Sequence, residues 1–195
     1  MISFEEEEFI LSHAYIPEHS VNLLAGVSGG EPFLLDDYLC CQRDDWIIVV
    51  GYPLQQDFEV DEFERSFESI KDRLHPRYVS VMAPEMPSQL REDCRKSEKD
   101  YFYILDIDEV HLKSGLRRAV KKASDLLRIE RSNTFLEPHQ KLMREFLERV
   151  QPEERVKNLL LKMPEYVQTA KGALLLNAWD HENRLAAFYV IDLEP

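Results

Sequence analysis

The stretch Asp100–Ile129, DYFYILDIDEVHLKSGLRRAVKKASDLLRI, decides the predicted fold class. Its first part, Tyr101–Ile107, is almost continuously apolar, which is typical of a strand that is buried on both faces. Farther along, apolar residues recur every three or four positions, as they do on one face of an amphipathic helix. These residues are Leu116, Val120, Ala123 and Leu127. The stretch therefore predicts a buried strand followed by a helix over residues 112–128.

The same predicted helix carries a second face that is strongly basic. Its cations are Lys113, Arg117, Arg118, Lys121 and Lys122. Arginine can hold a phosphate or carboxylate through two parallel hydrogen bonds, and lysine adds a point charge. This face is therefore the candidate anion-binding or substrate-binding site. A solvated helix face, paired with acidic residues elsewhere in the chain, is the alternative interpretation.

The segments on either side predict an α/β (α+β) fold with a mixed, mainly antiparallel sheet flanked by helices. Before the stretch described above, the expected elements are a hairpin at 38–42 and 46–51, a helix at 57–74, a strand at 77–83 and a short polar helix at 88–98. After it, they are an extended segment at 127–131, a helix ending near 150, an irregular helical stretch at 151–167 interrupted by proline, and a hairpin at 173–179 and 184–191. Residues 1–36 give no clear pattern: Glu5–Glu8 is expected to be a solvated face and Gly26–Pro32 a loop.

Two of the predicted helices have clear apolar stripes. The first stripe consists of Phe63, Phe67, Ile70 and Leu74, and the second of Leu142, Met143, Phe146, Leu147 and Val150. Residues at these spacings lie on one face of a helix. We therefore expect both sets to be buried against a sheet.

The charge of the chain is unevenly distributed. Residues 1–64 contain 15 acidic residues and one basic residue, which gives a net charge of −14. An acidic region of this size repels phosphates and argues against broad nucleic-acid binding. No apolar run approaches the roughly 20 residues of a membrane span. The acidic N-terminus is unlike a signal sequence, so the sequence predicts a cytoplasmic protein.

The nucleophilic and metal-ligating residues show no recognisable catalytic pattern. Cys40, Cys41 and Cys94 lack a CxxC or Cys/His spacing, so no metal site is expected. Cys40 and Cys41 lie in an apolar strand and should be unreactive because burial raises the pKa of a thiol. Asp180 and His181 fall in a predicted hairpin turn, where polar residues serve turn geometry. The other histidines have no neighbouring pattern that defines a catalytic triad.

Three segments resemble a known family. They are LKSGLRRAVKKASDLLRIERSNTF at 112–135, ALLLNAWDHENRLAAFYVID at 173–192 and GYPLQQDFEVDEFERSFESI at 51–70. Together they resemble the tandem acyltransferases of the GCN5-related type, in the branch that contains FemAB and phosphatidylglycerol lysyltransferase. The resemblance implies an acyl-CoA N-acyltransferase-like first domain at 1–131, which includes the basic connecting helix 112–128. It also implies the opening half of a second such domain, a partial second copy, at 132–195.

The resemblance further implies an activity. Such a protein would transfer an acyl or aminoacyl group from a CoA thioester or an aminoacyl-tRNA to an amine or hydroxyl acceptor. Acetyl-CoA or another acyl-CoA would be a donor substrate, with no covalently bound cofactor. The catalytic residue is not specified by the resemblance.

One departure from the family pattern favours a different function. The expected pyrophosphate turn, Gly51–Asp57, has one glycine and carries Asp57, with Glu59 close behind. Acidic residues repel a pyrophosphate, so the first domain is expected to be a non-catalytic copy. The alternative function is a binding or assembly module without turnover. Such a module would form a homodimer through the exposed edge of the second hairpin, at Phe188–Ile191.

Overall fold

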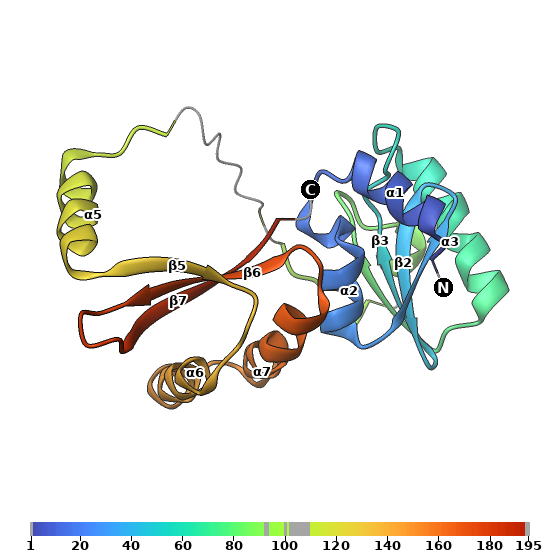
Figure 1. The fold of residues 1–195 in the computed structure, drawn as a ribbon. Helices are drawn as coiled ribbons and strands as arrows, with labels where there is room; N and C mark the ends of the chain where they lie inside the picture. The colour runs from blue at the N-terminus through green and yellow to red at the C-terminus, as the bar shows by residue number, and fades with distance from the viewer. Residues whose placement is uncertain (1, 92–93, 100, 102–109, 194–195) are drawn as a thin grey trace. The chain divides into compact units, whose positions relative to one another are not determined.

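The computed structural model describes residues 2–91, 94–99, 101 and 110–193 (Figure 1). The chain divides into two compact units, unit 1 up to residue 100 and unit 2 from 101 to 193. The expected boundary at 131 instead falls inside a strand of unit 2, because that strand is hydrogen-bonded to a strand after residue 170. The strand expected at 101–107 lies outside the described residues, apart from Tyr101.

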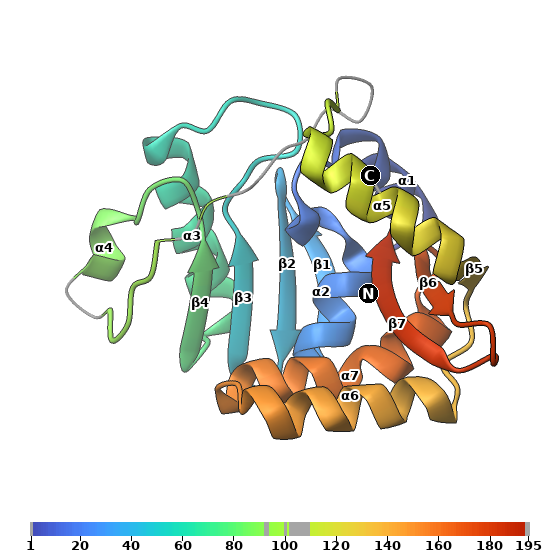
Figure 2. The ribbon, with the colours of Figure 1, turned by 90° about the vertical axis from the view of Figure 1, so that its left-hand side faces the viewer.

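Unit 1 contains a mixed four-stranded sheet. Its strands are β1 (Glu31–Leu35), β2 (Tyr38–Arg43), β3 (Trp46–Val50) and β4 (Tyr78–Met82). They lie side by side in the order β1-β2-β3-β4, as Figure 2 shows. The pairs β1/β2 and β2/β3 are antiparallel, and β3/β4 is parallel. The predicted hairpin and mixed sheet are therefore confirmed. The strand β1 is additional, because residues 1–36 gave no clear pattern, and the loop expected at Gly26–Pro32 is shorter, since helix α2 extends to Ser28 and β1 begins at Glu31.

Helices cover both faces of this sheet. The helices are α1 (Phe4–His13), the 3-10 helix η1 (Pro17–His19), α2 (Val21–Ser28), α3 (Val60–Leu74) and α4 (Ser88–Arg91). Residues of α1 and α2 pack in one core cluster with Cys41, whereas α3 packs in a second cluster with Cys40. Neighbouring residues of a strand point to opposite faces, so these two clusters lie on opposite sides of the sheet. Both cysteines are buried as expected.

The bounds and burial of the helices of unit 1 follow from identifiable side-chain interactions. Ser3 and Glu6 form a capping box at the start of α1, with the Ser3 Oγ accepting from the Glu6 N at 3.2 Å and the Glu6 Oε2 accepting from the Ser3 N at 2.7 Å. In α3, Phe63 and Phe67 are fully buried, which confirms the apolar stripe. Helix α4 ends at Arg91, earlier than the predicted 98, and residues 94–99 are not helical.

Unit 2 contains a three-stranded antiparallel sheet. Its strands are β5 (Arg128–Ser132), β6 (Ala173–Trp179) and β7 (Leu185–Asp192), in the order β5-β6-β7. The helices α6 (Glu137–Val150) and α7 (Glu154–Thr169) run beside each other (Figure 2). The predicted hairpin of β6 and β7 is confirmed. Helix α7 is continuous, and Pro164 lies within it rather than interrupting it.

The predicted apolar stripe of α6 is only partly buried. Met143 is buried, but Phe146 is 41% exposed and Val150 is 49% exposed, so the expectation for these two residues is wrong. The buried line runs instead through His139, Met143 and the partly buried Leu147, at a spacing of four. A small three-stranded sheet offers contacts to one such line of a helix, which leaves the neighbouring line in solvent.

A buried histidine fixes the junction of α6 with the sheet. The Leu136 N donates to the His139 Nδ1 at 3.0 Å, so in the neutral ring the Nε2 carries the proton. The His139 Nε2 then donates to the Asn177 Oδ1 of β6 at 3.0 Å. Both side chains are almost fully buried, and each satisfies the other.

Among the helices of the described residues, none is both long and apolar enough to cross a bilayer.

Candidate functional site: the basic helix

All five predicted cations lie on or beside one helix, α5 (Ser114–Leu126). The predicted range was 112–128, so the helix is slightly shorter at both ends. Lys113 is the N-cap residue, with extended backbone angles, and the Arg117 N donates to its carbonyl oxygen at 3.0 Å. The other four cations lie within the helix and are exposed.

The cations of α5 form two neighbouring rows on the half of the helix that faces away from its apolar stripe. Lys113, Arg117 and Lys121 follow each other at a spacing of four, and Arg118 and Lys122 repeat that spacing in a second row. At 100° per residue, the two rows lie side by side on one half of the helix, and Leu116 and Val120 fall on the other half. An elongated anion can therefore contact cations of both rows.

No carboxylate neutralises these cations within the part of the chain that the structure describes. Within these residues, the Arg118 Nε donates a hydrogen bond to the Ser114 carbonyl oxygen at 3.4 Å. Asp125, the acidic residue of α5, follows Lys121 by four residues and Lys122 by three, but it forms no ion pair with either of them within the described residues. The charges of α5 therefore remain available to a ligand, and exposed charges of this kind attract anions in a salt-dependent way.

The apolar stripe of α5 is not packed as the sequence predicted. Leu116 is 53% exposed, Val120 is 47% exposed, and no residue of the helix is buried. Only one residue, Leu127, separates α5 from β5, whereas a helix that folds back onto the next strand of a sheet usually needs a connection of two to six residues. The short connection explains why α5 does not cover its neighbouring sheet.

The turn that was expected to hold pyrophosphate has a different role. A Cβ atom on Gly51 would lie 2.6 Å from the Phe63 Cζ and 2.8 Å from the Ala83 Cβ. Glycine is therefore needed at position 51 for packing between β3 and α3. The following helix α3 has Asp61 and Glu62 in its first turn, and these carboxylates occupy the place where an anion would bind.

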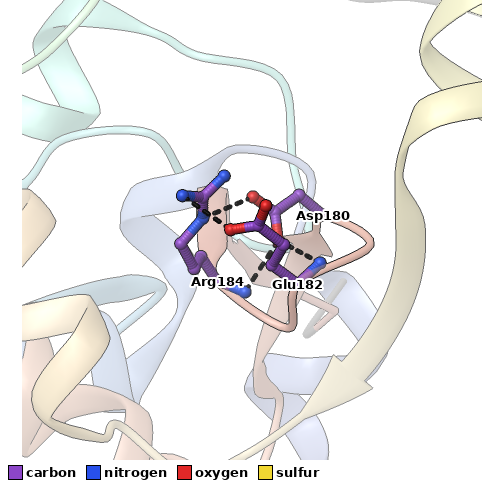
Figure 3. Close-up of polar contacts among 3 residues, drawn as sticks. All are labelled: Asp180, Glu182 and Arg184. Atoms are coloured by element: carbon purple, nitrogen blue, oxygen red, sulfur yellow. Dashed lines mark hydrogen bonds and ion pairs between the residues drawn. The ribbon is translucent and has the colours of Figure 1, made fainter.

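The turn between β6 and β7 is held by its own side chains (Figure 3). The Asp180 Oδ1 accepts from the backbone N of Glu182 and of Arg184, each at 2.9 Å. The Asp180 Oδ2 accepts from the Arg184 Nε at 2.8 Å, and the Arg184 Nη1 lies 2.8 Å from the Glu182 Oε2. The backbone hydrogen bond from Arg184 is the main cause that lowers the pKa of Asp180. Asp180 thus serves turn geometry, as the sequence indicated.

The two cysteines of β2 have little thiolate character and are therefore expected to be poor nucleophiles. Burial raises the pKa of the Cys40 thiol to about 12 and also raises that of Cys41. Among the described residues, no group of three or more His, Cys, Asp or Glu side chains is arranged to hold a metal ion.

A group of residues that the sequence did not single out lies at the turn between β1 and β2. It comprises Asp36 and Asp37, which form the turn, and the buried Tyr38, which begins β2. The signal in the sequence is the pair of acidic residues between two apolar segments, which predicts a two-residue hairpin turn once β1 is recognised.

Comparison of the chain with protein-family models, with curated proteins and with solved structures gives no match.

Proposed function

We propose that this chain is an acyltransferase-like protein of the GCN5-related tandem type, in which α5 binds the phosphates of the acyl donor. The observation that carries the proposal is the double row of exposed cations on α5, none of which is paired with a carboxylate among the described residues. CoA and the acceptor end of a tRNA both present several phosphates along an extended chain. Two rows of cations can contact such a ligand through charge-assisted hydrogen bonds.

The proposed reaction is a direct transfer. The nitrogen of an amine, or the oxygen of a hydroxyl, attacks the carbonyl carbon of the donor. The bond from that carbon to the thiol sulfur, or to the ribose oxygen, breaks. The acceptor loses a proton and the leaving group gains one. The role of α5 in this scheme is to hold and orient the donor, which lowers the entropic part of the barrier.

The test is a fluorescence titration of CoA, and of a tRNA, with the full chain and with the double variant Arg117→Ala/Lys121→Ala. Both substitutions remove cations of one row and leave exposed positions whose side chains support no core. We expect the affinity to fall about tenfold, which corresponds to about 1.4 kcal/mol. We also expect binding of both ligands to weaken as the salt concentration rises, because the contacts are exposed.

A matched control distinguishes the site from net charge. Lys141→Ala/Arg149→Ala removes two exposed cations from α6, and should change the affinity by less than twofold. Equal losses in both double variants, or no loss in the α5 variant, would contradict the assignment of the donor site to α5.

A binding or assembly module without turnover is the second candidate function. The observation that favours it is β7, which pairs only with β6 among the described strands and therefore has a free edge. Tyr189 of this strand is 69% exposed. An edge of this kind can pair with the same strand of a second copy. Light scattering should then show a dimer that Tyr189→Lys disrupts, because a lysine on an exposed edge strand disfavours pairing with another strand.

A further inference from the structure

The helix α5 has an apolar half that stays exposed. Leu116, Val120 and Leu126 fall within an arc of about 120° around the helix axis, and Ala119 and Ala123 lie between them. Leu126 is 50% exposed, and Leu116 and Val120 are exposed to a similar degree. An apolar arc of this width is normally buried against a core or a partner. This stripe is therefore free to contact a partner from outside the described part of the chain.

The cations on the other half of α5 reach both borders of this stripe. Arg117 lies about 60° from Val120 at one border, and Lys122 lies about 40° from Leu126 at the other. Long basic side chains can extend along an apolar surface and place their charge at its edge. The helix therefore presents an aliphatic strip with positive charge along both of its sides.

The charge of α5 is opposite to that of the chain as a whole. Lys113 and the four cations within the helix outnumber its one carboxylate, that of Asp125, whereas the chain has a net charge of −13. General adsorption of this protein to an anionic surface is therefore unfavourable. An anionic partner must be held through a local basic region, and the cations of α5 have no carboxylate partners among the described residues.

A lipid surface matches both halves of this helix. A helix with an aliphatic stripe and many Lys and Arg residues lies in the plane of a membrane interface, with its apolar side chains at the acyl chains and its cations at anionic headgroups. At 1.5 Å per residue, the 13 residues of α5 extend over about 20 Å. This length suits a helix that lies parallel to the surface and is too short to cross a bilayer.

A groove on another protein matches α5 less well. The helix contains no Trp, Tyr or Phe, the aromatic residues that are enriched at the centres of protein–protein interfaces. A protein groove would also need an apolar floor and acidic residues along both of its walls. A bilayer that contains anionic lipids supplies an apolar interior and negative charge along the whole length of the helix.

We propose that α5 is an interfacial helix that attaches this protein reversibly to a membrane surface containing anionic lipids. Leu116, Val120 and Leu126 enter the boundary between headgroups and acyl chains, and Arg117 and Lys122 contact lipid phosphates on either side. The proposal goes beyond donor binding, because it requires the apolar stripe, which the binding of a soluble phosphate does not use.

Co-sedimentation of the full chain with lipid vesicles tests the proposal. The vesicles consist of phosphatidylcholine with about one third phosphatidylserine, an anionic lipid. We expect binding that weakens as the salt concentration rises, and that is at least tenfold weaker on vesicles of phosphatidylcholine alone. No binding to the anionic vesicles at low salt would overturn the proposal.

The decisive variant is Leu116→Gln/Val120→Gln, which removes the apolar stripe and keeps every charge. Glutamine is a good helix former, and no residue of α5 is buried, so the fold should be unaffected. The vesicle affinity should fall at least tenfold, because two aliphatic side chains no longer leave water. Vesicle binding that survives this variant would show adsorption by charge alone and would refute the interfacial helix.

The matched control is Val156→Gln/Leu161→Gln in α7. It also replaces one valine and one leucine, which are 39% and 49% exposed. This variant should bind the anionic vesicles within twofold of the natural chain. An equal loss of vesicle binding in both double variants would overturn the assignment to α5.

Tryptophan reporters test how the helix lies on the membrane. Leu116→Trp places an indole within the apolar stripe, and Asp125→Trp places one on the opposite side of the helix. With anionic vesicles, the emission of the Leu116→Trp indole should move to shorter wavelengths, and that of the Asp125→Trp indole should not. Equal shifts of both indoles, or no shift in Leu116→Trp, would contradict the proposed orientation.

CoA binding separates this proposal from the proposed function. Leu116→Gln/Val120→Gln should bind CoA within twofold of the natural chain, since it retains all the cations. CoA binding without vesicle binding would refute the membrane proposal and leave the donor site. Vesicle binding without CoA binding would do the reverse. A dimer that this variant dissociates, in a chain that does not bind vesicles, would assign the stripe to a second copy and also refute the membrane proposal.

Discussion

Replacing Gly51 by alanine tests whether this residue serves packing. The added methyl group would lie 2.6 Å from the Phe63 Cζ, about 1 Å closer than an ordinary van der Waals contact. Phe63 cannot move away easily, because it is fully buried and its ring packs against Tyr38 at 5.2 Å and Phe67 at 6.2 Å. Overpacking of this kind typically costs about 1–3 kcal/mol. We therefore expect Gly51→Ala to destabilise unit 1 by about 2 kcal/mol.

The assay is equilibrium urea unfolding followed by tryptophan fluorescence. Unit 1 contains Trp46 and unit 2 contains Trp179, so a Trp179→Phe background makes the signal specific to unit 1. A loss of about 2 kcal/mol should lower the urea midpoint by roughly 1 M, with an unchanged slope. The matched control is Gly115→Ala, because a Cβ at Gly115 meets nothing within 4 Å. Gly115 lies in unit 2, so this substitution should leave the urea midpoint of unit 1 unchanged.

A double-mutant cycle with Phe63→Leu isolates the contact. If the methyl group collides with the Phe63 ring, then Gly51→Ala should cost clearly less in the Phe63→Leu background. A change below about 0.5 kcal/mol for Gly51→Ala, or an equal cost in both backgrounds, would refute the packing explanation.

Three further predictions concern buried polar groups and thiols. Burial lowers the pKa of His19, so at acidic pH the unfolded chain binds a proton more readily than the folded chain does. The urea midpoint should therefore fall as the pH drops below about 6.5, and His19→Gln should remove much of this dependence of the midpoint on pH. Asn177→Ala should lower the stability of unit 2 by about 1–3 kcal/mol, because the His139 Nε2 loses its acceptor; thermal unfolding by circular dichroism measures this, and an unchanged midpoint would contradict it. Cys94 is exposed and should react quickly with a thiol reagent, whereas Cys40, whose pKa is about 12, should react only on unfolding.

The elements that could be predicted from the sequence are those in which apolar residues recur with a clear period and are buried on one face. The hairpin of β2 and β3, the stripe of α3 and the hairpin of β6 and β7 all have a clear alternation or helical spacing. Helix α1 was not predicted, because its run of four glutamates separates the apolar residues and obscures their helical periodicity. The capping box formed by Ser3 and Glu6 was the local signal that could have located its start.

Burial was harder to predict than secondary structure. The stripes of α5 and α6 are real helical faces, but Leu116, Val120 and Phe146 are largely exposed. Periodicity shows which residues share a face, and it does not show whether a partner is present to cover that face. The candidate site was predictable in part for the same reason. The sequence placed five cations on one helix, but only the structure shows that they have no carboxylate partners among the described residues.

The surroundings of the turn between β1 and β2 could not be predicted for a different reason. Asp36 and Asp37 look like ordinary turn residues in the sequence, and Tyr38 looks like an ordinary strand residue. In the structure, the Gln55 N donates to the Asp37 Oδ2 at 2.9 Å and the Ser66 Oγ donates to the Asp36 Oδ2 at 3.0 Å, and both donors come from segments later in the chain. Contacts between segments distant in the chain are not encoded in local periodicity.

The exposure of α5 also has a consequence for the lifetime of the chain. A helix of 13 residues without a buried side chain is marginally stable in water and opens often. Opening would present four neighbouring peptide bonds, after Arg117, Arg118, Lys121 and Lys122, to trypsin-like proteases. A ligand that holds α5 closed would protect all of them together. Resistance to cleavage at α5 would therefore report its occupancy, and the abundance of the intact chain would follow the supply of that ligand.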